Sequence, residues 1–393
     1  MSIRTLARAW NDFFFKPQSP TPIALFRIFY GLLVLADLIL LRPEWLTWFG
    51  PRGLVSMATA HQMEPGTRIN LFSILPATAG AVDAFFWVFL LFTVLLIFGV
   101  WTRASALAVF LCVASIHERN LYIANSGDTL MRAMGFFLMF APAGAAISVD
   151  RLLRIWRGRE GLEIAPRAPW AQRMIQIEVA LLYLVTCWSK SQGETWVNGT
   201  ALYYVYHLTQ FQRFPVPGFF QDPAIIALQT WFTLAVEFSL GALVWIREWR
   251  YYILAAGVVL HLSLEYVMNV PLFQWILLGA YITFVEPEDL ARVGSRIRVR
   301  AAERITVVYD GASEASVRLA RVLQAVDVLG RLELVSENQP RRARLSVRTA
   351  SGTLDGFQAM RFLGRAVPVL WPLAIPSLLP LRRRALSAAP GAD

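Results

Sequence analysis

The chain has 393 residues, of which 56% are hydrophobic and only 16% are charged, and its mean hydropathy is +0.48. Soluble domains are about 45–50% apolar and about 25% charged, so this composition excludes an ordinary soluble protein and indicates a lipid environment. The net charge of +10 does not indicate a nucleic-acid partner, because the arginines lie mainly in short segments between apolar runs and in the C-terminal part.

Apolar runs follow one another through the first 290 residues. A helix of roughly 20 apolar residues crosses a bilayer. We predict spans near 22–41, 81–101, 104–117, 129–147, 174–189, 224–246, 251–269 and 272–285, of which the third and eighth are short. With eight spans, the arginine-rich segments fall on one side, which the positive-inside rule makes cytoplasmic. We therefore predict an all-α, multi-pass bundle of about eight helices in the bacterial inner (cell) membrane, with both termini in the cytoplasm.

The C-terminal part has a different pattern. RITVVYDG and RLELVSE are typical of strands, and the segment between them, SEASVRLARVLQAVDVLG, has helical spacing. This order predicts a small α/β domain. We thus expect two domains, a membrane domain over 1–290 and a cytoplasmic domain over 300–393. The tail from 366 is apolar and broken by prolines, and we expect it to contact the membrane surface through the arginines at 382–384.

Two segments on the predicted outer side, 42–80 and 190–223, are rich in aromatic residues. Trp and Tyr favour the membrane interface, where an apolar ring and a polar tip are both satisfied. Each segment can therefore be an interfacial loop. The alternative for these segments is a lid over a site that opens outward.

Ionisable side chains within apolar runs are the best indicators of a site, because each costs about 2.5–3.5 kcal/mol to insert at the bilayer centre. Lys190 ends the fifth run and is one of only two lysines among 37 basic residues. A desolvated lysine can lose its proton, which an arginine effectively cannot. The alternative is an interfacial lysine that extends its ammonium group to water.

Three further acids and a histidine lie in or beside these runs. Glu237 lies in the middle of the sixth run, where a carboxylate needs a partner or a proton. His261 and Glu265 are four residues apart and share a helix face, where they could relay a proton or only bridge helices. Asp128 and Arg132, also four apart at a helix start, are predicted to neutralise each other and to complement the helix dipole.

Two other features have structural interpretations. Arg27, one turn into the first run, needs a carbonyl or acid partner. Cys112 and Cys187 lie inside apolar runs and are read as small buried hydrophobes. The sequence contains no metal-ligand spacing, so we predict no metal.

Several stretches resemble the HTTM domain, the membrane region shared with vitamin K-dependent γ-carboxylase. They are SPTPIALFRIFYGLLVLADLI, NSGDTLMRAMGFFLMFAPAGAAISVD, LLYLVTCWSKSQGETWVNGTALYY, the acid Glu237, and VVLHLSLEYVMNVPLF, in the same order over about 285 residues. The resemblance implies a catalytic site with Lys190 as the base, His261 and Glu237 as its proton partners, and Asp128 nearby.

The resemblance also implies cofactors and substrates. In the animal carboxylase a deprotonated lysine in the membrane starts the oxygenation of reduced vitamin K, and the strong base formed removes a γ-proton from a glutamate before carbon dioxide adds. Reduced vitamin K or menaquinone, with O2 and CO2, is the implied cofactor set. Membrane lipid, a quinone, and a peptide or protein substrate are the implied partners.

The C-terminal stretch resembles the DCC-type thiol–disulfide oxidoreductases, which have a thioredoxin-like fold and an Asp-Gly-x-Cys-x-x-Cys signature after a strand. Asp310 and Gly311 match, but Ser313 and Ser316 stand at the cysteine positions. A serine hydroxyl forms neither a disulfide nor a reactive thiolate. The resemblance therefore implies a redox-inactive structural or docking domain.

Two hypotheses for function follow. The first is a γ-carboxylase-like membrane enzyme that acts on a quinone, lipid or peptide. The second is a non-catalytic scaffold, or a partner in peptide maturation or export, that presents the serine-substituted domain. Convergence of Lys190, Glu237 and His261 on one cavity favours the enzyme, whereas three residues that face separate helix seams favour the scaffold.

Overall fold

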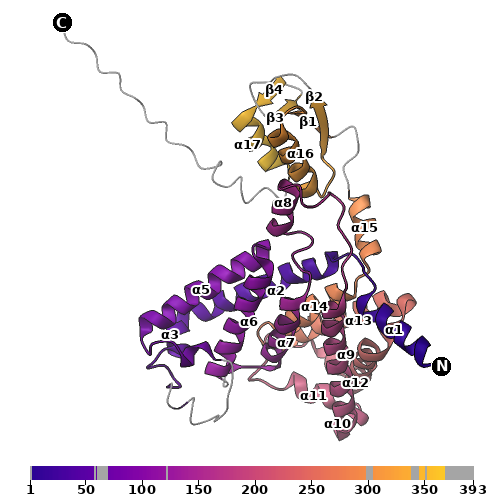
Figure 1. The fold of residues 1–393 in the computed structure, drawn as a ribbon. Helices are drawn as coiled ribbons and strands as arrows, with labels where there is room; N and C mark the ends of the chain where they lie inside the picture. Colours follow the sequence, from indigo (N-terminus) through magenta and orange to yellow (C-terminus); the bar gives the residue numbers. More distant parts are fainter. Residues whose placement is uncertain are drawn as a thin grey trace. The chain divides into compact units, whose positions relative to one another are not determined.

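A computed structural model describes residues 2–56, 59, 70–120, 123–297, 304–337, 345–349 and 352–367. The chain forms two compact units, one of residues 1–151 and 164–287 and the other of residues 152–163 and 288–393. The first unit contains the long apolar helices and the second contains a small sheet (Figure 1). The arginines at 298, 300 and 382–384, and most of the tail from 366, lie outside the described residues.

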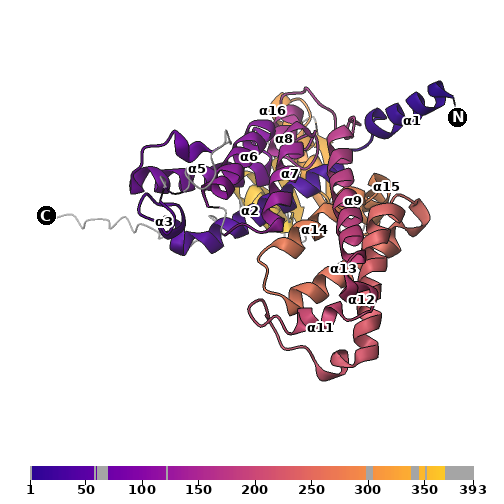
Figure 2. The ribbon, with the colours of Figure 1, turned by 90° about the horizontal axis from the view of Figure 1, so that it is seen from below.

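Within its described residues, the first unit is helical. Its helices are α1 (Ile3–Phe15), α2 (Thr21–Leu41), α3 (Trp45–Phe49), α5 (Ala79–Phe98), α6 (Thr102–Arg119), α7 (Ser126–Phe140), α9 (Trp170–Ser191), α10 (Glu194–Val197), α11 (Ala201–Tyr206), α12 (Pro223–Phe238), α13 (Arg247–Val267) and α14 (Phe273–Tyr281). Short 3₁₀ turns lie at Arg42–Glu44, Leu71–Ser73, Gly218–Gln221 and Ile282–Phe284, and a π turn, η5, at Ser239–Leu243. Figure 2 shows α9, α12 and α13 side by side, and α9 packs against both α12 and α14.

Local signals in the sequence explain several helix ends. The Thr78 hydroxyl accepts a hydrogen bond from the backbone N–H of Ala81 and so caps α5, which ends at Gly99 in the left-handed conformation (φ 67°). Asp222 caps α12, whose first residue is Pro223. These ends fix where each apolar stretch begins and stops.

Three helical segments are long and apolar enough to cross a membrane: Thr21–Phe49, Ala79–Phe98 and Pro223–Leu243. The predicted count of about eight spans is therefore not supported. The helices α7 and α14 have only 15 and 9 residues. The helices α6, α9 and α13 have the length, but each contains at least three charged residues, which lower its hydropathy.

Arg27 joins three parts of the first unit. Its buried guanidinium donates from Nη1 to the Ala143 carbonyl at 2.7 Å and from Nη2 to the carbonyls of Ile97 and Ile147 at 3.3 and 2.6 Å. A side chain at Gly99 would place its Cβ 2.6 Å from Nη1, so the glycine is required for this close approach. The structural interpretation of Arg27, with carbonyl partners, is confirmed.

The second unit contains a four-stranded mixed sheet in the order β2-β1-β3-β4. Its elements are α8 (Val149–Trp156, which begins in the first unit), α15 (Pro287–Arg296), β1 (Ile305–Asp310), α16 (Glu314–Val326), β2 (Leu332–Glu337), β3 (Leu345–Thr349), β4 (Gly352–Asp355) and α17 (Gly356–Ala366). β1 and β2 are parallel, whereas the pairs β1–β3 and β3–β4 are antiparallel. Val307, Val347, Leu323 and Leu363 form its core. The predicted small α/β unit is confirmed, while its thioredoxin-like assignment stays a prediction.

Candidate functional site

Lys190 and Glu237 form an ion pair between α9 and α12. The Lys190 ammonium contacts Oε1 of Glu237 and lies 5.0 Å from the centre of the Trp196 ring, which places it over an aromatic face. The side chain of Glu237 is only 8% exposed, against 29% for Lys190. The other carboxylate oxygen of Glu237, Oε2, is buried and has no hydrogen-bond partner among the described residues. The hydroxyl of Thr186, which donates to the Tyr183 carbonyl, also lies near this carboxylate.

The backbone beside Glu237 departs from a regular α-helix. One turn of π-helix, η5, follows α12 directly after Phe238. Such turns occur frequently at functional sites. A Cβ at Gly241, within this turn, would lie 2.5 Å from Cγ of Leu184 on α9. The π turn and α9 are thus in close contact, which holds the Glu237 helix against the Lys190 helix.

His261 belongs to a second group of polar side chains. Its Nε2 lies 2.5 Å from the hydroxyl of Tyr183, and its Nδ1 lies 2.5 Å from Oε1 of Gln274. The hydroxyl of Tyr183 also contacts that of Tyr281 at 2.7 Å. All four side chains are buried, and they come from α9, α13 and α14.

The two groups lie in the same region of the first unit. Tyr183 and Lys190 are two helical turns apart on α9 and so point to similar sides of it. The Glu237 carboxylate lies within electrostatic range of both tyrosines, and the Lys190 ammonium lies within range of His261. The structure therefore joins Lys190 to Glu237 directly and places His261 in a neighbouring group, and none of the three residues lines either of the two hollows described below.

The sequence analysis missed Tyr183, Gln274 and Tyr281. The available signal was their spacing, because Tyr183 precedes Lys190 by seven residues and Gln274 precedes Tyr281 by seven. Residues seven apart in a helix lie on one face. A glutamine in an otherwise apolar run, like a charged residue there, also requires a hydrogen-bonding partner.

Asp128 has a different environment. It forms a capping box at the start of α7, in which Oδ2 accepts from the backbone N–H of Asn125 at 2.6 Å, and its Oδ1 lies 3.5 Å from Nε2 of His117. Arg132 pairs instead with Glu118. The predicted Asp128–Arg132 pair is therefore wrong, because the capping role turns the carboxylate toward the backbone at the helix start. Asp128 makes no hydrogen bond or ion pair with Lys190, Glu237 or His261, all of which are among the described residues.

Glu265 also pairs with a residue other than His261, with which it was predicted to share a helix face. It pairs with Arg213 at 2.5 Å, and Arg213 also donates to the side-chain oxygen of Asn269 at 3.2 Å. A proton relay between His261 and Glu265 finds no contact here, whereas the bridging interpretation fits Glu265. The 190–223 segment is thus fixed to α13 at one end, while its Trp196 covers Lys190 at the other.

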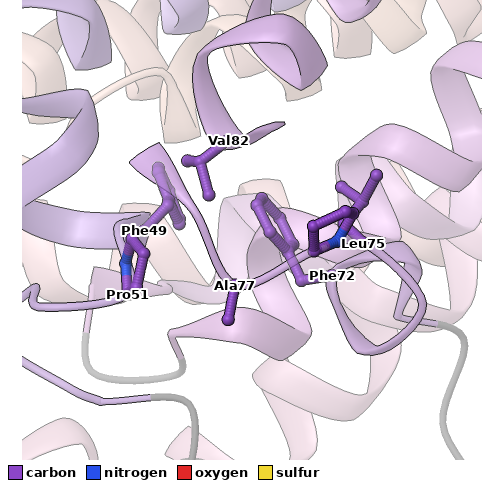
Figure 3. Close-up of a pocket in the computed structure, with 7 residues that line it drawn as sticks. Phe49, Pro51, Phe72, Leu75, Ala77 and Val82 are labelled. Carbon is purple, nitrogen blue, oxygen red and sulfur yellow. The ribbon is translucent and has the colours of Figure 1, made fainter. Parts of the chain in front are cut away.

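Two hollows in the first unit lie elsewhere. Figure 3 shows an apolar one of about 10 Å³, lined by Phe49, Pro51, Phe72, Leu75, Pro76, Ala77 and Val82. That volume holds about one water molecule, so it cannot take a substrate. A more open one of about 380 Å³ is lined by Leu46, Gly50, Pro51, Arg52, Ala77, Thr78 and Ala79. Lys190 lines neither hollow.

The degenerate redox positions lie where β1 meets α16. Asp310 ends β1, and its Oδ1 accepts from the backbone N–H of Ala312 at 2.9 Å. Ser313 is the N-cap residue of α16, although its side chain makes no capping hydrogen bond. Ser316, in the first turn of α16, is fully buried, and its hydroxyl has no hydrogen-bond partner among the described residues. Among those residues, no three or more His, Cys, Asp or Glu side chains are grouped to hold a metal ion.

Comparison with known proteins identifies the family of this chain. The HTTM domain family matches residues 15–288, which is more than half of the chain. The protein belongs to the HTTM domain family. It is also 25% identical over 254 residues to the uncharacterized protein YitO of Bacillus subtilis (strain 168), a match that covers 61% of this chain and 79% of YitO. No solved structure matches. The HTTM resemblance is thus confirmed for the membrane region, and the DCC resemblance stays a prediction.

Proposed function

We propose that this HTTM protein is a membrane enzyme in which Lys190 acts as a base. The observation that carries the proposal is the ion pair of Lys190 and Glu237 beneath Trp196, with Oε2 of Glu237 buried and unpartnered. A buried polar atom without a partner costs about 1–3 kcal/mol. A site that binds a hydrogen-bond donor recovers this loss when the donor arrives.

The chemistry of the pair suits proton transfer. Removing two charges from water is costly, and a lysine, unlike an arginine, can avoid this cost by giving its proton away. If the ammonium of Lys190 passes a proton to Glu237, both groups become neutral and the amine gains a lone pair. That lone pair is the proposed base, and the Lys190 side chain, 29% exposed, is accessible to a substrate.

The residues present fit a reduced quinone such as reduced vitamin K or menaquinone. A hydroquinone hydroxyl is the donor that Oε2 of Glu237 lacks, and the Trp196 indole offers a flat surface for an aromatic ring. When bound, the group would supply the electrons for reaction with O2, with CO2 as the second gas. The residues of this chain would orient the ring, accept its hydrogen bond and hold the proton at Lys190 or Glu237.

The substrate class follows from position. Lys190 ends a helix of the membrane-associated domain, where a quinone, a lipid or a membrane-bound peptide can approach. Glutamate carboxylation is the form of the reaction that the family resemblance implies. We further propose a multi-pass topology with both termini in the cytoplasm, which requires an even number of crossings and hence at least one beyond the three apolar segments.

Mass spectrometry of lipids and peptides from cells with and without the protein tests this function. We expect one modified species, such as a carboxylated glutamate, to depend on the protein and to be lost in both Lys190→Ala and Lys190→Arg. The matched control is Lys16→Arg, because Lys16 lies outside the site and follows α1. Full product with both Lys190 variants would exclude Lys190 as the base.

The second candidate is a non-catalytic scaffold or a partner in peptide maturation or export. Ser316 favours it, because the buried hydroxyl stands at a position where the DCC resemblance places a redox cysteine. On this hypothesis, substitutions at Lys190 lower the abundance of the protein but leave its effect per folded molecule unchanged. Normalising each product signal to the amount of folded protein therefore separates the two candidates.

A further inference from the structure

Four buried polar side chains in the first unit form a continuous row of hydrogen bonds. In order they are Tyr281, Tyr183, His261 and Gln274, and they are 5%, 2%, 3% and 2% exposed. The contacts along the row are 2.7 Å between the two hydroxyls, 2.5 Å from Tyr183 to Nε2 of His261, and 2.5 Å from Nδ1 to Oε1 of Gln274. We call these four residues the proton chain.

The chemistry of the groups fixes where each hydrogen lies. An amide oxygen only accepts, so Nδ1 of His261 must carry a hydrogen and donate it to Gln274. In a neutral imidazole the other nitrogen, Nε2, is then an acceptor. The hydroxyl of Tyr183 must donate to Nε2, and its oxygen must accept from Tyr281. Every hydrogen bond in the row therefore points in the direction from Tyr281 to Gln274.

Such a row can take up one proton without moving any heavy atom far. A proton that arrives at the Tyr281 oxygen releases the original hydroxyl hydrogen to Tyr183. Tyr183 then passes its own hydrogen to Nε2 of His261. The net change is one proton gained, held as an imidazolium whose Nδ1–H still donates to Gln274. Both tyrosines end neutral, with their hydroxyl hydrogens pointing the opposite way.

We propose that the proton chain receives, through Glu237, the proton that Lys190 loses when it becomes a base, so that His261 is its final acceptor and Gln274 a positioning residue. The uptake of the Lys190 proton by the chain rests on the proposed function. The direction of the hydrogen bonds in the chain does not depend on it. The charges agree with this assignment. Lys190 and His261 lie within electrostatic range of each other, so loss of the lysine charge removes a like charge that opposes an imidazolium at His261.

Packing around Tyr281 also supports a fixed geometry. Gly257 lies one turn before His261 on α13, and a Cβ there would be 2.6 Å from the Tyr281 hydroxyl and 3.0 Å from its ring. The hydroxyl therefore occupies the space that any larger residue at 257 would need. This close contact holds Tyr281 against Tyr183.

Nitrogen-15 NMR of the histidine rings in the full-length protein in lipid nanodiscs tests the direction of the chain. The chain has four histidines, which makes selective labelling practical. Nδ1 of the exposed His207 faces the Tyr203 carbonyl at 2.7 Å, so the experiment uses a His207→Gln background. We expect one neutral ring with hydrogen on Nδ1 and a bare, hydrogen-bonded Nε2, and its signal should be absent from His261→Asn.

Two variants of Gln274 distinguish positioning from packing. Gln274→Glu still offers an acceptor and should keep the hydrogen on Nδ1. Gln274→Leu removes the acceptor and should shift the ring toward hydrogen on Nε2. A wild-type His261 with hydrogen on Nε2, or with the same tautomer in Gln274→Leu, would overturn the assignment whatever the activity of the protein.

The product assay tests the use of the chain. Tyr183→Phe should lower product formation by at least about 10²-fold, the lower range for loss of an acid–base group. The matched control is Tyr206→Phe, which removes a hydroxyl that contacts Gln229 at 2.7 Å outside the chain. Equal product from Tyr183→Phe and wild type, together with an inactive Lys190→Ala, would refute the chain and leave the proposed base intact.

Discussion

At the scale of single residues, charged side chains in the first unit are satisfied by partners distant in the sequence. Arg27 contacts carbonyls more than 60 residues away, and Lys190 contacts an acid 47 residues away. Paired charges are what burial in an apolar environment requires. Several buried atoms of such groups lack a hydrogen-bond partner among the described residues, including Nε of Arg27 and Oε2 of both Glu237 and Glu265. We assign a function to Oε2 of Glu237, because this acid pairs with a lysine rather than an arginine.

We expect the ion pair to add little net stability. Its main effect is that neither charge is buried without a partner. Lys190→Met leaves the Glu237 carboxylate buried without a cation, and loss of one partner of a buried pair costs about 3–5 kcal/mol. We expect the lower end of this range, because the Lys190 side chain keeps 29% exposure. The double variant Lys190→Met/Glu237→Leu should recover most of the loss.

Chemical unfolding in detergent, followed by circular dichroism, measures these differences. A double variant that is as unstable as the sum of both single variants would show that the two side chains do not interact. Lys16→Met serves as the control, because Lys16 is an exposed residue at the end of α1.

Ser316 offers a residue-scale prediction in the second unit. Its hydroxyl is fully buried without a partner among the described residues, a cost of about 1–3 kcal/mol that an apolar side chain of similar size avoids. We expect Ser316→Ala to raise the free energy of unfolding by about 1 kcal/mol. Ser313→Ala, which removes a hydroxyl that makes no capping bond, should change it by less than about 0.5 kcal/mol. Thermal unfolding of the full chain measures both differences. A Ser316→Ala variant that is less stable than the wild type would mean that the hydroxyl has a partner.

At the scale of elements, the sequence located helices well and their contacts poorly. Apolar runs marked α2, α5 and α12 because such runs are a local signal. The pairing of Lys190 with Glu237 joins α9 to α12, and spacing along one helix carries no information about another. The predicted Asp128–Arg132 pair failed for a related reason, because the Asn125 backbone and the distant Glu118 offered better partners.

Span prediction failed at the same scale. A helix that packs against other helices can be short or carry polar residues, as α14 and α13 do, because neighbouring helices rather than lipid surround part of it. Hydropathy alone therefore separates Ala79–Phe98 clearly from its neighbours but cannot count the remaining crossings.

The contact between η5 and α9 leads to a prediction about elements. Gly241→Ala would place a Cβ 2.5 Å from Cγ of Leu184, so we expect a loss of about 1–3 kcal/mol from overpacking. The double variant Gly241→Ala/Leu184→Ala should be less destabilised than the sum of the two single variants, because the smaller residue at 184 makes room. Gly218→Ala, with open space around it, is the control. Unfolding curves that give simple additivity would show that the two helices do not share this contact.

At the scale of the whole molecule, the composition and the family agree on a membrane protein, and orientation is the property to determine. The proposed topology places 190–223 on the outer side and the second unit in the cytoplasm. This orientation matters for function, because it makes Lys190 and Trp196 accessible from the side opposite the C-terminal sheet.

Cysteine labelling tests this orientation, because the chain has only two natural cysteines and Cys112 is buried. In a Cys112→Ala/Cys187→Ser background, single cysteines would be placed at the exposed positions Thr209 and Val328. In sealed vesicles of known orientation, a membrane-impermeant maleimide should label Thr209→Cys only from the outer side and Val328→Cys only from the cytoplasmic side. Labelling of both positions from one side would mean that the segment between them crosses the membrane an even number of times, and not the odd number that the proposed topology requires. If that side were the cytoplasmic one, the site at Lys190 would have to receive its substrate from the cytoplasm.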